Sequence, residues 1–273
     1  MSIATEISRL QTAKASIKTA IEGKGVTVPS SATLDTYDDY VDAIQTGGGG
    51  NYDVGLKFTG NTIPISAFTN TNSLTDVVIS NNITSIGNYA FRGCTKLSAC
   101  TIPDSVTSIG NYAFHSCSGL TEITIPSGVT TINTYAFTQI KSATAITFSQ
   151  GSRLNSIGTR AFSDTSKYPA AVNVVLPEGL TTIGANAFTT TDGIATLSIP
   201  STVTSIGNDA FRGLTYCTSI TCLATTPPTI GTNCFDKTAG DHSGCTIYVP
   251  STNVNDYKTA WSDYASRIEA IPT

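Results

Sequence analysis

The chain repeats a phenylalanine at a nearly fixed interval along most of its 273 residues. The successive spacings are 23, 23, 23, 25, 26, 23 and 24 residues, at Phe68, Phe91, Phe114, Phe137, Phe162, Phe188, Phe211 and Phe235. A unit this short cannot bury a hydrophobic face on its own, so about eight units must stack on one another. The spacing therefore predicts an elongated solenoid, with these rings in its apolar spine and its outer faces free for binding.

One unit, residues 120–137, shows how each copy is expected to fold. Its sequence, LTEITIPSGVTTINTYAF, begins with apolar and polar residues in alternation, which is typical of a short strand. Pro126 ends this strand because proline cannot donate to a continuing ladder. A second short extended segment, Val-Thr-x-Ile, follows before the repeat phenylalanine.

A turn signal follows the second strand in nearly every unit. Four residues before the phenylalanine stand Gly87, Gly110, Asn133, Gly158, Gly184, Gly207 and Gly231. Glycine replaced once by asparagine predicts a backbone with positive φ at this position. The next position holds mostly Asn or Thr, which favours an N-cap for a single helical turn. Each repeat is therefore predicted as strand, turn, short strand, turn and one helical turn.

The same unit is echoed by IPDSVTSIGNYAFHSC and IPSTVTSIGNDAFRGL, in which several fixed positions recur together. On these residues the chain resembles the BspA-like leucine-rich repeat family, over about residues 56–250. The resemblance implies a solenoid with a parallel sheet on one face, commonly used for adhesion and surface recognition. The predicted fold class is an α+β repeat solenoid, with the repeats at residues 51–250.

The two ends of the chain differ from the repeats. Residues 1–46 carry apolar residues at helical spacing and predict two helices, which either attach or oligomerise the protein or cap the first repeat. Residues 47–50 are four glycines and predict a flexible tether. Residues 251–273 predict a closing helix, whose apolar face would cover the open end of the stack: Tyr257, Trp261, Tyr264 and Ile268. A ligand platform is the alternative role for Trp261.

The segment ISRLQTAKASIKTAIEGKGVTVPSSATLDTYDDYVDAIQTGGGG, about a sixth of the chain, carries a second resemblance. It is similar to the N-terminal modules of bacteriophage virion proteins, particularly tail-fibre-like and other minor structural components. The resemblance implies attachment to other virion proteins through residues 1–46 and assembly in a host cytoplasm. By analogy with fibres, it also implies a homo-oligomer, with a trimer as the expected form.

Composition and charge narrow the classes of partner. Charged residues make up only 12% of the chain and the net charge is −4, without a basic stripe, which argues against nucleic acid. No apolar run approaches the roughly 20 residues that span a bilayer, so we expect no membrane insertion. The N-terminus lacks the basic and apolar regions of a signal peptide, which predicts synthesis in a cytoplasm without general secretion.

The seven cysteines include no CxxC pair. Cys94, Cys100 and Cys117 occupy repeat positions, which predicts that they pack as small hydrophobic residues. The remaining four cluster near a histidine and could form a disulfide or hold a metal: Cys217, Cys222, Cys234 and Cys245, with His242. Their spacings match no zinc pattern, so no metal is expected.

No catalytic site is predicted, and no cofactor. The two histidines of the chain lie far apart in repeat order, and no Ser/His/Asp or Cys/His set follows the repeat. The glycine tract has no Lys-Ser/Thr of a phosphate-binding loop, and carboxylates do not pair at a consistent spacing. The chain is therefore expected not to be an enzyme.

Two outward stripes are the candidate binding surfaces. One is the hydroxyl-rich non-core face of the strands, represented by Glu122 and Thr124. The other has Arg92 and His115 just after the phenylalanine, and tyrosines two residues before it that should stack about 5 Å apart: Tyr89, Tyr112 and Tyr135. Tyrosine favours recognition of protein or glycan, whereas packing along the solenoid edge is the alternative. The variety of residues at the His115 position predicts a solvated side chain.

The leading interpretation is a non-enzymatic phage virion protein of tail-fibre or receptor-binding type. It would recognise a protein or glycan of the bacterial surface through its repeats. The alternative is a bacterial cell-surface adhesin of the BspA-like family.

Overall fold

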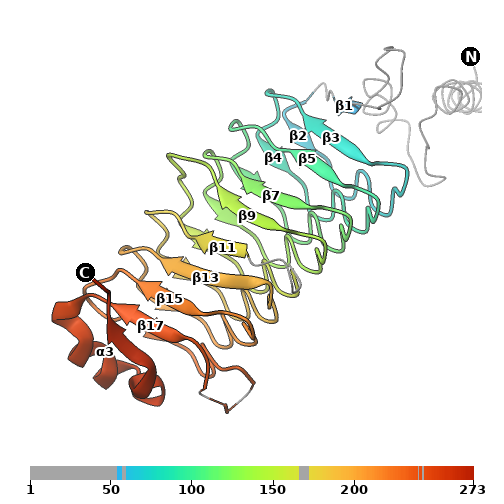
Figure 1. The fold of residues 1–273 in the computed structure, drawn as a ribbon. Coiled ribbons are helices and arrows are strands. Elements are labelled where there is room, and N and C mark those ends of the chain that lie inside the picture. The colour runs from blue at the N-terminus through green and yellow to red at the C-terminus, as the bar shows by residue number, and fades with distance from the viewer. Residues whose placement is uncertain (1–53, 57–59, 166–171, 239, 242) are drawn as a thin grey trace, which may run out of the picture.

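The computed structural model describes residues 54–56, 60–165, 172–238, 240–241 and 243–273. Over these residues the chain winds into a parallel β-solenoid of about nine turns. Figure 1 shows the coils stacked in single file from β1 to β17, with α3 at the C-terminal end. The predicted helices of residues 1–46 and the tether at 47–50 lie outside the described residues.

Each coil contributes one longer strand, and each coil but the last also contributes a two-residue strand. The longer strands are β1 (Val54–Leu56), β3 (Asp76–Ile79), β5 (Ala99–Thr101), β7 (Glu122–Ile125), β9 (Ala145–Phe148), β11 (Val172–Val175), β13 (Ile194–Ile199), β15 (Ser219–Cys222) and β17 (Thr246–Val249). The short strands are β2 (Thr62–Ile63), β4 (Ser85–Ile86), β6 (Ser108–Ile109), β8 (Thr131–Ile132), β10 (Ser156–Ile157), β12 (Thr182–Ile183), β14 (Ser205–Ile206) and β16 (Thr229–Ile230). All of these strands pair in parallel, and the short ones form one continuous eight-stranded sheet.

The longer strands form three separate sheets on the other face, in the orders β1-β3-β5, β7-β9 and β11-β13-β15-β17-β18. Along these strands burial alternates, as in β7, where Ile123 and Ile125 are buried and Glu122 and Thr124 are exposed. The predicted parallel strands are therefore confirmed, with one side of each strand facing the core and the other facing solvent.

The predicted helical turn before each phenylalanine is wrong. Alternate N–H groups of this segment donate to the next coil, as from Tyr89 to Asn111 (2.9 Å) and from Phe91 to the carbonyl of Ala113 (2.8 Å). The intervening N–H groups close only tight four-residue turns, such as Arg92 N–H to the carbonyl of Tyr89 (3.1 Å). Because half of the donors point along the solenoid axis, the i to i−4 bonds of an α-helix cannot form.

The glycine that precedes this segment has a different role from the one predicted. Gly207, like its counterparts in other repeats, does not have a left-handed φ. A Cβ at Gly207 would lie 2.5 Å from the backbone nitrogen of Ala185 in the preceding coil. Glycine is required here by the close approach of two backbones. The left-handed conformation instead occurs two residues later, as at Asn186 (φ 56°) and Asp209 (φ 54°).

The predicted N-cap position also makes contacts between coils. The side-chain oxygen of Asn88 accepts the N–H of Asn111 (2.8 Å), and that of Asn111 accepts the N–H of Thr134 (3.1 Å). Asn208 accepts from Thr232 in the same way (3.0 Å). An amide side chain at this position therefore ties its coil to the next one and caps no helix.

The predicted phenylalanine ladder is confirmed. All eight rings are buried, and successive ring centroids are 5.0 to 5.7 Å apart with nearly parallel planes. Burial of each ring contributes on the order of 2–3 kcal/mol, and stacking adds about 0.5–1.5 kcal/mol for each pair. The ladder therefore forms a continuous apolar spine that no single repeat could bury alone.

The C-terminal segment closes the open end of this spine. It consists of the short 3-10 turns η1 (Ser251–Asn253) and η2 (Ser262–Arg267), the helix α3 (Val254–Ala260) and the strand β18 (Ile268–Ala270). Trp261 is 1% exposed, packs on Phe235 (5.2 Å between ring centroids) and donates from Nε1 to the carbonyl of Pro228 (2.9 Å). This burial argues against Trp261 as a ligand platform. Ile268 leaves the helical segment and pairs with Ile247 of β17.

The seven cysteines are free thiols. Cys94 and Cys117 are buried at one repeat position, and their Sγ atoms donate to the carbonyls of Phe68 and Phe91 (3.0 Å each). Cys100 of β5 pairs with Val77 and packs against the core. The packing role predicted for these three cysteines is confirmed.

Candidate recognition surface

Three tyrosines form a continuous stack on the side of the coils that is made by the turn before each repeat phenylalanine. The ring centroids of Tyr89 and Tyr112 are 5.0 Å apart, and those of Tyr112 and Tyr135 are 4.7 Å apart. The planes differ by 10° and 6°. These three residues are called the tyrosine ladder below. The spacing predicted from the repeat is confirmed, and all three side chains are half-buried.

The backbone of the tyrosine ladder is left-handed at each tyrosine, with φ of 57° to 59°. This conformation costs a residue with a Cβ roughly 1–2 kcal/mol, and bulky side chains seldom adopt it. At the same position the last three repeats have Asn186, Asp209 and Asn233, residue types that tolerate this conformation, whereas two others have Ser66 and Arg160. Stacking offsets part of this cost, by about 0.5–1.5 kcal/mol for each pair of rings.

An arginine lies over each end of the tyrosine ladder. The guanidinium carbon of Arg92 is 5.8 Å from the ring centroid of Tyr89, and that of Arg160 is 5.8 Å from the centroid of Tyr135. Within the described part of the chain, neither arginine has a carboxylate within ion-pair distance; the ion pairs found there are Lys141–Asp164 and Arg212–Asp209. The ladder thus ends in two positive charges that no acidic side chain among the described residues neutralises.

His115 lies against the middle of the tyrosine ladder. Its ring centroid is 5.5 Å from that of Tyr112, and its Nδ1 is 2.9 Å from Oγ of Ser116. Ser116 also donates to the side-chain oxygen of Gln139 (2.9 Å). Burial lowers the pKa of His115, and the nearby charge of Arg92 lowers it further. The ring is therefore held in its neutral form near pH 7.

The His115 position is less solvated than predicted. Arg92 is exposed there, but His115 is half-buried, and the equivalent Thr138, Ser163 and Thr189 are buried. The physical reason is a hydrogen bond between coils, because the hydroxyl of Thr138 donates to the carbonyl of Arg160, and the hydroxyl of Thr189 acts likewise. A short hydroxyl side chain can reach this carbonyl without leaving the surface of the coil.

The second predicted stripe lies on the face of the longer strands, apart from the tyrosine ladder. Glu122 and Thr124 are both exposed there, and the hydroxyl of Thr124 is 3.0 Å from that of Thr147 in the next coil. The structure therefore keeps the two predicted stripes on different sides of the coil. Thr124 belongs to a hydroxyl pair between strands.

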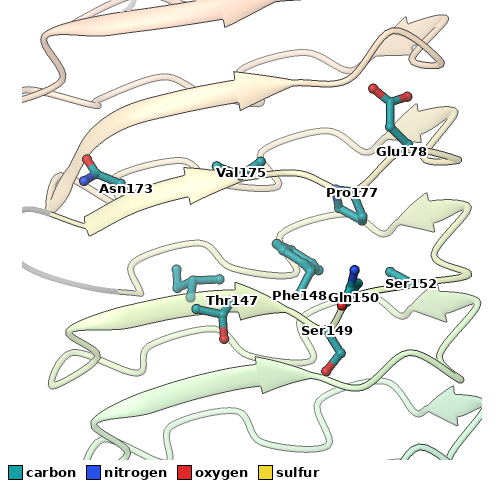
Figure 2. Close-up of a pocket in the computed structure, with 11 residues that line it drawn as sticks. Thr147, Phe148, Ser149, Gln150, Ser152, Asn173, Val175, Pro177 and Glu178 are labelled. Atoms are coloured by element: carbon teal, nitrogen blue, oxygen red, sulfur yellow. The ribbon is translucent and has the colours of Figure 1, made fainter.

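A hollow of about 540 Å³ lies on this face between β9 and β11, and the sequence did not predict it. Figure 2 shows Val175, Pro177 and Phe148 along its apolar part, with Asn173 at one end and Glu178 at the other. Val175 is 66% exposed. The hollow occurs where β9 and β11 belong to separate sheets, at the repeats whose phenylalanine spacings lengthen to 25 and 26 residues.

Comparison with protein families identifies the repeat. The family model described as "BspA type Leucine rich repeat region" matches residues 61–172 and 170–257, well over half of the chain. The chain belongs to this family. The BspA-type match covers the coils that carry the phenylalanine ladder and the tyrosine ladder, and it does not include residues 1–46.

Several solved structures resemble this BspA-type chain. A leucine-rich cell surface protein from Faecalibacterium prausnitzii A2-165 is 23% identical, with a TM-score of 0.42, and the match covers 83% of this chain and 69% of that one. The T. pallidum leucine-rich repeat protein TpLRR is 22% identical, with a TM-score of 0.46 and coverages of 77% and 80%. The pneumococcal vaccine antigen PcpA is 17% identical, with a TM-score of 0.43 and coverages of 74% and 69%. No match was found among curated proteins.

The described residues contain no group of three or more His, Cys, Asp or Glu side chains arranged to hold a metal ion. His242, which the sequence placed near four cysteines, lies outside the described residues. In the same part of the chain, no helix has the length and apolarity that crossing a bilayer requires.

Proposed function

We propose that this chain is a non-enzymatic recognition protein of a bacterial cell surface, and that the tyrosine ladder is its contact site. The observation that carries this proposal is three consecutive tyrosines kept in a left-handed backbone that asparagine or aspartate would occupy at lower cost. Strained residues cluster at binding sites, where the surrounding structure holds them in place. Membership of the BspA-type repeat family supports a surface role over the virion role.

The chemistry of the ladder favours an acidic glycan as the ligand. The ring faces are covered by one another and by Arg92 and Arg160, so a sugar cannot stack on them. Ring edges and phenolic groups remain for contact, in a row that advances by one coil at a time. Guanidinium groups pair well with carboxylates, and those of Arg92 and Arg160 have no carboxylate partner among the described residues.

The test compares binding of the protein to two immobilised polysaccharides of similar length, one acidic, such as a polyuronate, and one neutral. The proposal predicts binding to the acidic polymer. Tyr112→Asn should reduce binding at least about tenfold, which corresponds to about 1.4 kcal/mol. Thermal stability should be retained, because asparagine suits a left-handed backbone, as at Asn186. Arg160→Gln should weaken binding of the acidic polymer, whereas the exposed Arg153→Gln, the matched control, should not.

Unchanged polysaccharide binding by Tyr112→Asn would leave only the packing role for the ladder and overturn the proposal. Binding of a bacterial surface protein, with no binding of either polysaccharide, would reject the glycan as the ligand class. If Tyr112→Asn loses binding and its folded state together, Arg160→Gln decides the question, because it removes a half-buried charge and no aromatic ring.

A virion role is the second proposal, and one observation favours it. Residues 1–46 resemble the N-terminal modules of phage tail-fibre-like proteins, which implies attachment to other virion proteins. That segment lies outside both the described residues and the family match. Antibody detection of the protein on purified phage particles would support this proposal, and detection on the surface of uninfected cells would support the adhesin.

A further inference from the structure

Two cysteines meet at the last coil of the solenoid, beside the C-terminal segment. β15 and β17 pair in parallel with Ser219 opposite Thr246, so the residues just before these strands lie in neighbouring coils. Cys245 directly precedes β17, Cys217 lies two residues before β15, and both line the same cavity of about 310 Å³. Asp236, Lys237 and Arg267 are the charged residues that line it with them, and Asp236 Oδ1 already accepts the hydroxyl of Tyr264.

The two thiols have unequal environments. Cys217 is buried, with its Sγ donating to the carbonyl of Ser219 (3.3 Å), whereas Cys245 is half-buried. Arg267 Nη2 is 3.7 Å from Sγ of Cys245, and Arg267 Nε donates to the carbonyl of Cys245 (2.8 Å). A second anchor, from Arg267 Nη1 to the carbonyl of Phe235 (3.1 Å), holds the guanidinium beside this sulfur.

This arrangement makes Cys245 the reactive member of the pair. The neighbouring thiol of Cys217 lowers the pKa of Cys245 to about 7; burial opposes this shift and the charge of Arg267 supports it. The neighbouring thiol of Cys245, together with burial, raises the pKa of Cys217. The thiolate is the form of cysteine that attacks disulfides, so Cys245 is the expected nucleophile near neutral pH.

We propose that Cys245 and Cys217 form a thiol-exchange site that closes into a disulfide when the protein meets a small-molecule disulfide. The Cys245 thiolate attacks one sulfur of that compound, forms a mixed disulfide and releases one thiolate. Cys217 then gives up its proton, attacks Sγ of Cys245 and releases the second thiolate. Two protein thiols are oxidised and one small-molecule disulfide is reduced to two thiols.

The chain contains its own control for this proposal. Cys94 and Cys117 also lie in neighbouring coils, but both are fully buried and donate to backbone carbonyls. No charged group is among the contacts that these two thiols make. Both pairs therefore lie in neighbouring coils. Only the pair of Cys217 and Cys245 has a thiol that solvent reaches and a guanidinium beside it.

The experiment is peptide mapping by mass spectrometry after the reduced full-length protein is incubated with oxidised glutathione. We expect a linked pair of peptides that contains Cys217 and Cys245, with the mass of two hydrogen atoms lost. Cys94 and Cys117 should remain free thiols until the protein is denatured. Cys217→Ala should stop at the first step and accumulate glutathione on Cys245, and Cys245→Ser should accumulate neither product.

Equal modification of Cys94 and Cys117 in the folded protein would overturn the proposal, as would Cys217→Ala without glutathione on Cys245. Circular dichroism of each variant establishes that it is folded. If Cys217→Ala does not fold, the wild-type linkage map decides alone: the absence of a Cys217–Cys245 link rejects the site. This test is independent of ligand binding at the tyrosine ladder.

Discussion

At the residue scale, the closest approach between coils decides which side chains are allowed. A Cβ at Gly110 or Gly184 would lie 2.7 Å from backbone atoms of the preceding coil. The recurrence of glycine marks this position in the sequence, but the predicted cause, a positive φ, is wrong. Single-sequence patterns cannot distinguish these causes, since a close approach is a property of two coils and φ is a property of one residue.

We expect Gly207→Ala to destabilise the fold by about 1–3 kcal/mol, because the new methyl group would overlap the backbone of Ala185. Gly60→Ala is the matched control, since a Cβ there meets no atom within 4 Å. Urea unfolding of both variants measures the difference. Equal free energies of unfolding for the two variants would contradict the packing described here.

His115 should make stability depend on pH. Its pKa is lowered in the folded state from the usual 6.5, so below that value the unfolded chain binds the proton more readily. Stability is therefore lost as the pH falls from about 6.5 towards the lower folded-state pKa. His115→Asn should lose less stability than wild type between about pH 7.5 and pH 5.5, as measured by urea unfolding at both values. A pH dependence identical to that of wild type would show that His115 does not contribute.

At the scale of the element, the segment before each phenylalanine is where sequence and structure differ most. Asn followed by x-Ala-Phe suits a helical turn as well as the observed ladder, because the deciding hydrogen bonds, such as Phe91 to Ala113, join residues of different coils. The alternation in strands such as β7 was easier to recognise, since burial of every second residue is visible in one strand alone. Local sequence patterns therefore predicted the strands but not the conformation of the turn before each phenylalanine.

We expect Phe137→Ala to cost about 3–5 kcal/mol, because the ring is buried between Phe114 and Phe162 and its removal opens a cavity in the spine. Ile65→Ala, at a side chain that is 68% exposed, should change stability by less than about 0.5 kcal/mol. Measuring the free energy of unfolding of both variants tests this difference in stability. A similar small effect at both positions would mean that the ladder does not stabilise the solenoid.

At the scale of the whole molecule, the repeat period predicted the solenoid, its spine and the tyrosine stack. It did not predict the hollow between β9 and β11, because that depends on where the sheet of longer strands divides. The strand β18 was also missed, since Ile268 continues the helical spacing of Tyr257, Trp261 and Tyr264. The repeat period cannot predict structure where the spacing changes or where the repeats end, and both the hollow and β18 lie at such places.

Residues 1–46 remain a proposed attachment or oligomerisation module. If they oligomerise the protein, light scattering should give a multiple of the 28.4 kDa chain mass for the full chain and a single-chain mass for a variant lacking them. A trimer is the expected multiple. A single-chain mass for both proteins would remove oligomerisation and leave attachment or capping as the role of this segment.

The most direct test of the stacked spine is nuclear magnetic resonance of protein labelled only in its phenylalanine and tyrosine rings. The structure predicts nuclear Overhauser contacts from ring to ring in coil order, from Phe68 through to Phe235, and a separate series that joins Tyr89, Tyr112 and Tyr135. Rings that show contacts only within their own coil, or phenylalanine rings that are open to a solvent probe, would contradict it.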